Sequence, residues 1–301
     1  MLRSASRALV VALLVPVVPL VAASPAAAAP DEPAVGSYVA LGDSYAAGPL
    51  IPLQTGLPPG CLRSNRNYPA LVAGTLGAAD FRDASCSGAT TADLTAAQRT
   101  PLGTNAPQLD RLDADVALVT VTIGGNDIGF GEIIQECARR SPAAPLGSAC
   151  KDHYTAGGQD QLAARIAATA PKVAAVLAAI DDRSPDADVL VVGYPTILPD
   201  SGPGCFPVVP LSAGDVAYLR ETEKRLNAML ADEADRAGVE FVDTYTPTIG
   251  HDVCRPPGVK WVEGLVPTAP AAPVHPNGLG MTAMAAAVGE VLADRGVEPA
   301  A

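Results

Sequence analysis

The sequence predicts an α/β fold in which a parallel sheet of five strands is covered by helices on both faces. Short apolar runs alternate along the chain with longer, alanine-rich segments of helical periodicity. The run over residues 116–123 is an almost unbroken stretch of apolar and β-branched residues, as is typical of a strand buried on both faces. Alternation of strands and helices implies right-handed crossovers and therefore a parallel sheet.

The predicted strands are five short apolar runs. They are residues 38–41, a weaker run near Phe81, then residues 116–123, 189–193 and 239–242, the last interrupted by Glu240. Each run is bounded by Gly, Pro or Asp, which end strands. Between them, residues 161–180 and 215–237 carry apolar side chains at helical spacing, and a last helix is expected over 282–294, after Asn277-Gly278.

Residues 1–29 have the order of a secretory signal peptide. Arg3 and Arg7 precede an apolar run over residues 8–23, and four alanines at 26–29 follow before Pro30. The apolar run is short for a membrane-spanning helix, so export is favoured over an N-terminal anchor. We therefore expect a secreted, extracellular protein. No repeat, low-complexity linker or charge block divides residues 30–301, which predicts a single domain.

The charge of the chain excludes several classes of partner. The sequence has 32 acidic and 20 basic residues, a formal net charge of -12, and 17% charged against 49% apolar residues, which is not the profile of a disordered chain. An acidic surface without a Lys/Arg-rich stripe repels phosphate backbones, so we expect no nucleic-acid partner. Anionic membranes should be repelled for the same reason. We expect no stable membrane insertion, and a monomer.

The six cysteines include no C-x-x-C pair, and the chain has no H-E-x-x-H motif. The usual zinc spacings are therefore absent, and neither a metal nor a cofactor is expected. An even number of cysteines in an oxidising compartment favours three disulfides, although six cysteines allow about 15 connectivities, among which the sequence alone does not choose. The simplest pairing is sequential: Cys61–Cys86, Cys137–Cys150 and Cys205–Cys254.

Four short polar segments lie where the predicted strands end or the last helix begins. They are Gly42-Asp43-Ser44-Tyr45, Cys86-Ser87-Gly88-Ala89-Thr90, Gly124-Gly125-Asn126-Asp127 and His275-Pro276-Asn277. In such a sheet, ligands bind beyond the carboxyl ends of the strands. A hydroxyl, an imidazole, a side-chain amide and turns with free N–H groups are the components of acyl transfer. Each segment alone is equally typical of a helix cap or a turn.

A histidine base must be one of three residues, because the chain contains only His153, His251 and His275. His153 lies in a polar loop after Cys150 and is expected at the surface. His251 lies beyond the fifth predicted strand and competes with His275 for the role of base.

These four segments, in this order and at this spacing, resemble the sequence blocks of the SGNH hydrolases, also called the GDSL family. The similarity extends to residues 61–64, 68–71, 86–91, 123–130 and 193–195, and is closer still to the secreted actinobacterial lipases and esterases of that family. The resemblance implies a flavodoxin-like three-layer α/β/α sandwich and sequential pairing of the six cysteines. It also implies that Ser44 is the nucleophile, His275 the base, and the Ser44 and Gly88 N–H groups with Asn126 the oxyanion hole.

One position departs from the family pattern. Many members have an aspartate three residues before the catalytic histidine, where this chain has Ala272. We therefore expect a Ser44–His275 dyad in which a backbone carbonyl of Ala272 or Pro273 accepts the Nδ1–H. Support of His275 by an acidic residue, Asp243 or Asp252, is the open alternative.

The sequence says less about the substrate than about the catalytic residues. Proline-rich apolar segments at residues 48–53, 57–59 and 206–211 either rim an acyl-chain groove or pack as loops held by Cys61 and Cys205. Aromatic residues make up only 4% of the chain, which disfavours a sugar-stacking platform. The sequence thus favours a secreted carboxylic ester hydrolase, a lipase or esterase, with phospholipids among its candidate substrates. The alternatives are a carbohydrate or cell-wall O-deacetylase and a non-catalytic secreted binding protein.

Overall fold

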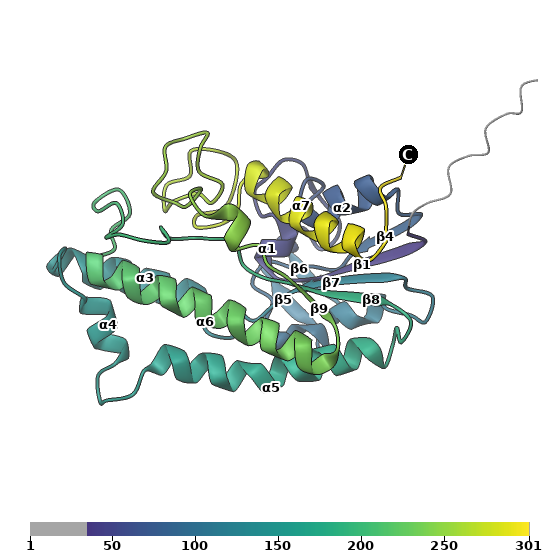
Figure 1. Cartoon of the computed structure of the whole chain (residues 1–301), viewed down its shortest axis with the longest axis horizontal. Coiled ribbons are helices and arrows are strands. Elements are labelled where there is room, and N and C mark those ends of the chain that lie inside the picture. Colours follow the sequence, from purple (N-terminus) through teal and green to yellow (C-terminus); the bar gives the residue numbers. More distant parts are fainter. Residues whose placement is uncertain (1–34, 301) are drawn as a thin grey trace, which may run out of the picture. The chain divides into compact units, whose positions relative to one another are not determined.

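A five-stranded parallel sheet forms the centre of the computed structural model, which describes residues 35–300 (Figure 1). The strand order is β4-β1-β7-β8-β9, the flavodoxin-like order. All neighbours are parallel. The predicted α/β/α fold is confirmed, and each strand lies within two residues of its predicted run: β1 (Ser37–Gly42), β4 (Asp80–Asp83), β7 (Leu118–Thr122), β8 (Asp188–Val192) and β9 (Glu240–Val242).

Alternate side chains of each strand pack into two separate hydrophobic cores. Tyr38 and Ala40 of β1 belong to the core under α2 (Tyr68–Leu76) and α7 (Gly278–Asp294). Val39 and Leu41 belong to the core under α5 (Gln161–Asp181) and α6 (Ala213–Ala237). Figure 1 shows these helix pairs on opposite faces of the sheet. The strands are therefore buried on both faces, which explains their nearly continuous apolar sequence.

The helices are more numerous than the periodicity predicts. Helices α5 and α6 match their predicted ranges, whereas α7 begins four residues early, because Asn277 caps it by accepting hydrogen bonds from the N–H groups of Leu279 and Gly280. The remaining elements are short and were not predicted. They are helices α1 (Ser44–Ala47), α3 (Phe130–Arg140) and α4 (Ala149–Tyr154), 3-10 turns η1 (Pro59–Cys61), η2 (Thr91–Leu94), η3 (Gln108–Arg111), η4 (Ser141–Ala143) and η5 (Thr246–Thr248), and the antiparallel pairs β2 (Gln54–Thr55) with β3 (Arg63–Ser64) and β5 (Gln98–Thr100) with β6 (Gly103–Asn105).

Three disulfides join segments that follow the strands, one of them linking α3 to α4. The structure pairs Cys61 with Cys86, Cys137 with Cys150, and Cys205 with Cys254, which are the sequential pairs. No cysteine among residues 35–300 is left free.

Helix α5 is the one described helix that is long and apolar enough, by length and composition, to cross a membrane. A core helix of a globular domain meets the same criterion. Here Leu162, Ile166, Val173, Leu177 and Ile180 are buried against the sheet core, and α6 packs along its length. The structure thus accounts for its composition by packing within the domain. The predicted leader, residues 1–29, lies outside the described residues, and the assignment of one domain to residues 30–301 stays a prediction.

Candidate active site

The parallel sheet brings the predicted polar segments together at one edge. Ser44 follows β1 directly as the first residue of α1, and Asp43 caps that helix. Gly42 must be glycine, because its φ is +143° and a Cβ there would lie 2.5 Å from the carbonyl oxygen of Thr122 on the neighbouring strand β7. This close approach holds the Ser44 turn at the end of β7.

Ser44 and His275 form a hydrogen-bonded pair although 231 residues separate them. The Ser44 Oγ lies 2.7 Å from His275 Nε2, and His275 Nδ1 lies 2.7 Å from the carbonyl oxygen of Pro273. A carbonyl can only accept, so Nδ1 carries the proton and Nε2 is free to accept one from Ser44. Desolvation lowers the pKa of His275 below its usual 6.5, against a smaller opposing effect of the Pro273 carbonyl. The imidazole is therefore neutral at pH 7 and can act as a base.

Neither candidate aspartate supports His275. The Asp243 carboxylate accepts hydrogen bonds from the N–H groups of Tyr245 and Thr246. Asp252 is fully buried and accepts from the Cys254 N–H and the Arg255 guanidinium. The sequence left open whether a backbone carbonyl or an acidic residue contacts His275 Nδ1. In the structure, the Pro273 carbonyl oxygen makes this contact.

The other two histidines lie away from this pair. His251 stacks on Trp261 with ring centroids 3.4 Å apart, and its Nδ1 lies 2.6 Å from the carbonyl oxygen of Val259. His153 is at the surface near Glu136, at 3.7 Å.

The residues of the predicted oxyanion hole belong to turns that are tied to one another. Gly88, at φ +80°, lies in the turn after β4, and its N–H has no acceptor among the described residues. Asn126 Nδ2 donates to the carbonyl oxygen of Ala89 at 2.9 Å, which uses one of its two hydrogens and orients the amide beside Gly88. As the first residue of a helix, Ser44 has no intrahelical acceptor for its N–H.

Two buried polar side chains outside the predicted set fix these turns. The Asp127 carboxylate accepts from both the N–H and the Oγ1 of Thr91. The Gln108 amide forms two hydrogen bonds to the backbone of Gly42, at 2.7 and 2.9 Å. Gln108 was missed because a single glutamine in a loop carries no sequence signal.

Asp43 and Tyr194 connect the Ser44 turn to the Asn126 turn. The Tyr194 hydroxyl donates to the Asp43 carboxylate at 2.6 Å and accepts from the Gly125 N–H at 2.8 Å, and Asp43 also accepts from the Tyr45 N–H. Burial raises the pKa of Asp43 to about 7, although the hydrogen bonds from Tyr194 and Tyr45 oppose this rise. Tyr194 thus bridges the turn that carries Ser44 and the turn that carries Asn126.

A second set of contacts holds His275. The Tyr45 hydroxyl donates to the carbonyl oxygen of Val274 at 2.7 Å, and the Tyr45 ring lies 5.0 Å from the imidazole. Behind the histidine, the Glu263 N–H donates to the His275 carbonyl, and the buried Glu263 carboxylate accepts from Asn277 and Thr268. The His275 loop is therefore held on both sides.

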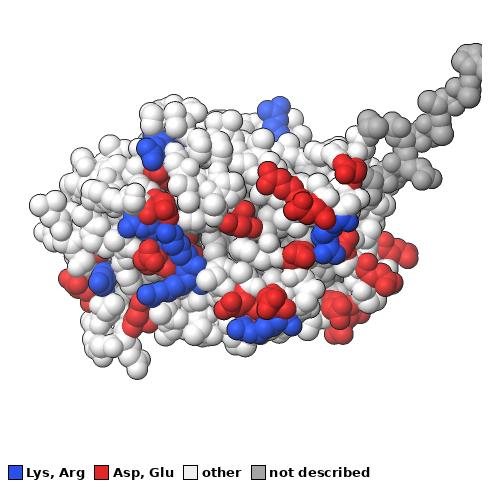
Figure 2. All heavy atoms as spheres, viewed as in Figure 1, with Lys and Arg blue, Asp and Glu red and all other residues white. Residues whose placement is uncertain are grey.

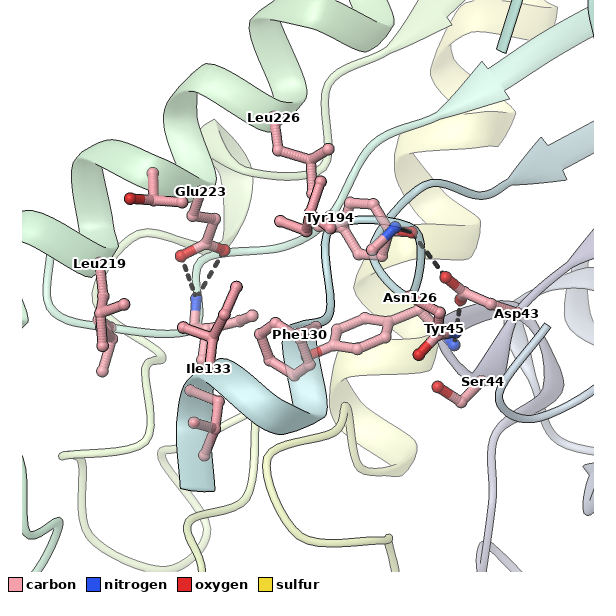
Figure 3. Close-up of a pocket in the computed structure, with 16 residues that line it drawn as sticks. Asp43, Ser44, Tyr45, Asn126, Phe130, Ile133, Tyr194, Leu219, Glu223 and Leu226 are labelled. Atoms are coloured by element: carbon pink, nitrogen blue, oxygen red, sulfur yellow. Dashed lines mark hydrogen bonds between the residues drawn. The ribbon is translucent and has the colours of Figure 1, made fainter. Parts of the chain in front are cut away.

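An apolar pocket opens beside Ser44 (Figure 3). It encloses about 620 Å³ of space free of protein atoms, including its part open to solvent. Its walls come from α3, α6 and the segment after β8, with Ile128, Phe130, Ile133, Ile134, Tyr194, Ile197, Leu198, Leu219 and Leu226 as the apolar and aromatic lining. None of the three proline-rich segments lines this pocket. Its walls could have been sought instead in the apolar faces of α3 and α6.

Glu223 is the one acidic residue on the α6 wall of this pocket. Its carboxyl group accepts a hydrogen bond from the N–H of Ile197, and burial raises its pKa well above the usual value. Burial therefore favours the neutral form of this carboxyl group. Across residues 35–300, no cluster of three or more His, Cys, Asp or Glu side chains is arranged to hold a metal ion.

The arrangement thus combines a serine hydroxyl, a neutral imidazole at hydrogen-bond distance and N–H donors on neighbouring turns, beside an apolar pocket. These are the components of acyl transfer.

Comparison with known proteins is consistent with this chemistry. Residues 40–283 match the sequence profile of the GDSL-like Lipase/Acylhydrolase family. The chain is 40% identical over 277 residues to Lipase 2 of Streptomyces coelicolor, covering 90% of this chain and 89% of that protein. It is 34% identical over 254 residues to a lipase of Streptomyces rimosus, covering 84% and 85%.

Two solved structures are also similar. Phospholipase A1 from Streptomyces albidoflavus NA297 superposes with a TM-score of 0.69 at 26% identity, and the extracellular lipase from Streptomyces rimosus with a TM-score of 0.66 at 30% identity. Each match covers 85% of this chain and 99% of the other.

Replacing Tyr194 by Phe tests the bridge between the two turns. The variant leaves one oxygen of the buried Asp43 carboxylate and the buried Gly125 N–H without a partner, so the free energy of unfolding should fall by about 2 kcal/mol in urea titrations. The displaced turns should also slow phosphonylation of Ser44 by a fluorophosphonate about 10- to 100-fold.

Tyr38→Phe is the matched control, because it also removes one buried hydroxyl hydrogen bond, to Thr120, but lies in the β1 interior. It should lose stability and keep the labelling rate. Equal labelling rates in the two variants would show that Tyr194 contributes to stability alone.

Proposed function

Since the chain belongs to the GDSL-like lipase/acylhydrolase family and is a carboxylic ester hydrolase, we propose that it is secreted and hydrolyses acyl or lipid esters through an acyl-enzyme on Ser44, with His275 as the base. The observation that carries this proposal is the 2.7 Å contact between Ser44 Oγ and His275 Nε2 beside the apolar pocket. Three disulfides and the predicted leader support secretion. The named phospholipase among the similar structures makes phospholipids candidate substrates.

The first half of the reaction acylates the serine. Ser44 Oγ attacks the ester carbonyl carbon while its proton moves to His275 Nε2. The carbonyl π bond opens, and the N–H groups of Ser44 and Gly88 and the Asn126 amide stabilise the oxyanion. When the carbonyl re-forms, the bond to the leaving oxygen breaks, and that oxygen takes the proton from Nε2. An alcohol departs, and the acyl group stays on Ser44.

The second half repeats these steps with water. His275 takes a proton from the water as its oxygen attacks the acyl carbon, and the same donors stabilise the second oxyanion. Collapse breaks the bond to Ser44 Oγ, which regains its proton from His275, and a carboxylic acid leaves. The Pro273 carbonyl fixes the imidazole tautomer throughout but carries no full charge, so the imidazolium forms without a carboxylate beside it.

The pocket predicts a preference for acyl chains longer than acetate. We expect kcat/KM on p-nitrophenyl esters to rise about two- to fourfold per added methylene until the pocket is filled, since each buried methylene contributes about 0.8 kcal/mol. Ser44→Ala should abolish both hydrolysis and fluorophosphonate labelling.

A steep preference for acetate would contradict the acyl-chain assignment and favour the deacetylase. Absence of labelling in the unmodified protein, or labelling that survives Ser44→Ala, would contradict the serine mechanism.

Removing the Asn126 amide tests the oxyanion hole. Asn126→Ala should lower kcat about 10²- to 10³-fold with little change in KM, because the amide acts on charge that develops only in the transition state. Asn105→Ala is the control, since Asn105 is a buried asparagine that contacts Arg63. That variant should keep kcat within about threefold. An unchanged kcat in Asn126→Ala would remove the residue from the mechanism.

The pH profile tests the base. Because protonated His275 cannot accept the Ser44 proton and its pKa is lowered, kcat/KM should be constant at neutral pH and fall about tenfold per pH unit below an apparent pKa under 6.5. Asp243→Asn and Asp252→Asn should keep this limb and retain kcat within about threefold, because neither residue contacts the imidazole.

A loss of about 10⁴-fold in either variant would identify a triad aspartate. If kcat/KM instead falls near pH 7, and if Asp43→Asn abolishes this fall, the titrating group is Asp43, whose pKa is about 7.

A further inference from the structure

Exposed apolar side chains are concentrated in four loops. Of the eleven large hydrophobic residues that are exposed among residues 35–300, nine lie in segments 48–66, 94–109, 201–212 and 253–280. They are Leu50, Leu53, Leu57, Leu102, Phe206, Val208, Val259, Val266 and Leu279. Leu146 and Ile249 are the two elsewhere. We call the four segments together the docking face.

The four segments adjoin one another and border the catalytic pair. The Ala272 N–H donates to the Pro49 carbonyl, which joins the His275 loop to the loop that follows Ser44. Gly60 contacts Thr100 and Leu102, which joins that loop to the β5–β6 pair. Val209 and Val274 line one small apolar cavity, and Cys205 is bonded to Cys254. Leu53, Leu57 and Leu102, 63–77% exposed, therefore lie on loops that are linked to the His275 loop.

The charges of these segments differ from those of the rest of the chain. They contain a single acidic residue, Glu263, and it is fully buried. Their exposed charged residues are all cationic, namely Arg66, Arg99 and Arg255. The 32 acidic residues of this strongly acidic chain thus lie almost entirely elsewhere. In Figure 2, red and blue side chains gather over the α5 and α6 side, whereas the loops drawn above α6 in Figure 1 are mostly white.

We propose that the docking face binds the surface of a lipid aggregate, so that the enzyme takes its ester from a lipid–water interface. This inference rests on the proposed function, because a lipid surface bound at the docking face would supply acyl esters to the pocket. An apolar surface of this extent, without exposed carboxylates, matches the headgroup and upper acyl region of a lipid layer.

Local charge also predicts which lipids are accepted. At physiological ionic strength, charges more than about 8 Å apart are largely screened, so carboxylates far from the face contribute little there. Asp93, Asp110, Asp200 and Asp252 directly flank its segments, and Asp252 pairs with Arg255 at 3.2 Å. Arg66 and Arg99 are the exposed cations of the face that pair with no carboxylate among the described residues. Anionic phosphatidylglycerol vesicles should therefore bind at least as tightly as phosphatidylcholine vesicles, in contrast to the repulsion that net charge alone predicts.

The test separates binding from hydrolysis. The Ser44→Ala protein is mixed with phosphatidylcholine or phosphatidylglycerol vesicles, and binding is measured by co-sedimentation and hydrogen exchange. Residues 48–62 and 100–104 should gain protection, whereas α4 and α5 should not. In the same background, L53D/L57D/L102D should weaken binding about a hundredfold, because three leucines no longer enter the lipid. L146D, which changes a still more exposed leucine between α3 and α4, should bind as before.

With Ser44 intact, the triple variant should hydrolyse soluble p-nitrophenyl butyrate at the unmodified rate, which also shows that it is folded, and should lose hydrolysis of vesicle lipid. Unaltered exchange in the two loops, equal vesicle binding by the triple variant, or at least tenfold weaker binding to phosphatidylglycerol than to phosphatidylcholine would overturn the proposal. Protection of the same loops without vesicles, together with a dimer in light scattering, would assign the face to a second copy of the chain and overturn it too.

The two proposals fail separately. If the unmodified enzyme hydrolyses soluble esters but the Ser44→Ala protein does not bind vesicles, the docking face fails and the proposed function stands. If vesicles bind and protect the loops but no ester is hydrolysed, the proposed function fails.

Discussion

The site depends on the parallel pairing of β1 with β4 and β7, which forces their carboxyl ends to one edge of the sheet. Parallel strands cannot be joined by tight turns, so each strand end is followed by a free loop. Three such loops carry Ser44, Gly88 and Asn126, and a fourth segment, before α7, carries His275. Gly42 shows how close this approach is, because even a methyl group there would collide with β7. The sheet supplies proximity, but it does not fix the loops relative to one another.

Buried polar side chains that contact two loops fix the loops relative to one another. Tyr194 joins the turns after β1 and β7, Asp127 joins those after β7 and β4, and Gln108 holds Gly42. Such groups are costly to bury unless every hydrogen bond is made. Because their partners are mostly backbone atoms in irregular segments, each bond also removes freedom from a loop. The catalytic geometry is therefore held by hydrogen bonds more than by apolar packing.

The sequence predicted the architecture because the strands are buried on both faces and therefore carry continuous apolar runs, and because α5 and α6 are long enough to show their period. Helix α3 was not predicted, although Phe130, Ile133 and Cys137 follow its helical period. Phe130 and Ile133 line the pocket, so this part of the lining was not predicted either. Ser44 and His275 could be proposed because their segments have a recognisable order. Tyr194, Gln108 and Glu263 act through contacts between distant segments, which no local pattern records.

The charge distribution shows how a whole-chain quantity can mislead about a site. A formal charge of -12 predicts repulsion from anionic surfaces, and it would be correct if the carboxylates were spread evenly. They are not, because the four segments of the docking face hold one acid, Glu263, and that acid is buried behind His275, where Asn277 and Thr268 donate to it. The acids beside Ser44 and Asn126, namely Asp43 and Asp127, accept hydrogen bonds from Tyr194 and Thr91, and burial raises the pKa of Asp43 to about 7. The acids of this edge are therefore engaged by hydrogen bonds within the loops, and the docking face presents no exposed carboxylate to an apolar substrate.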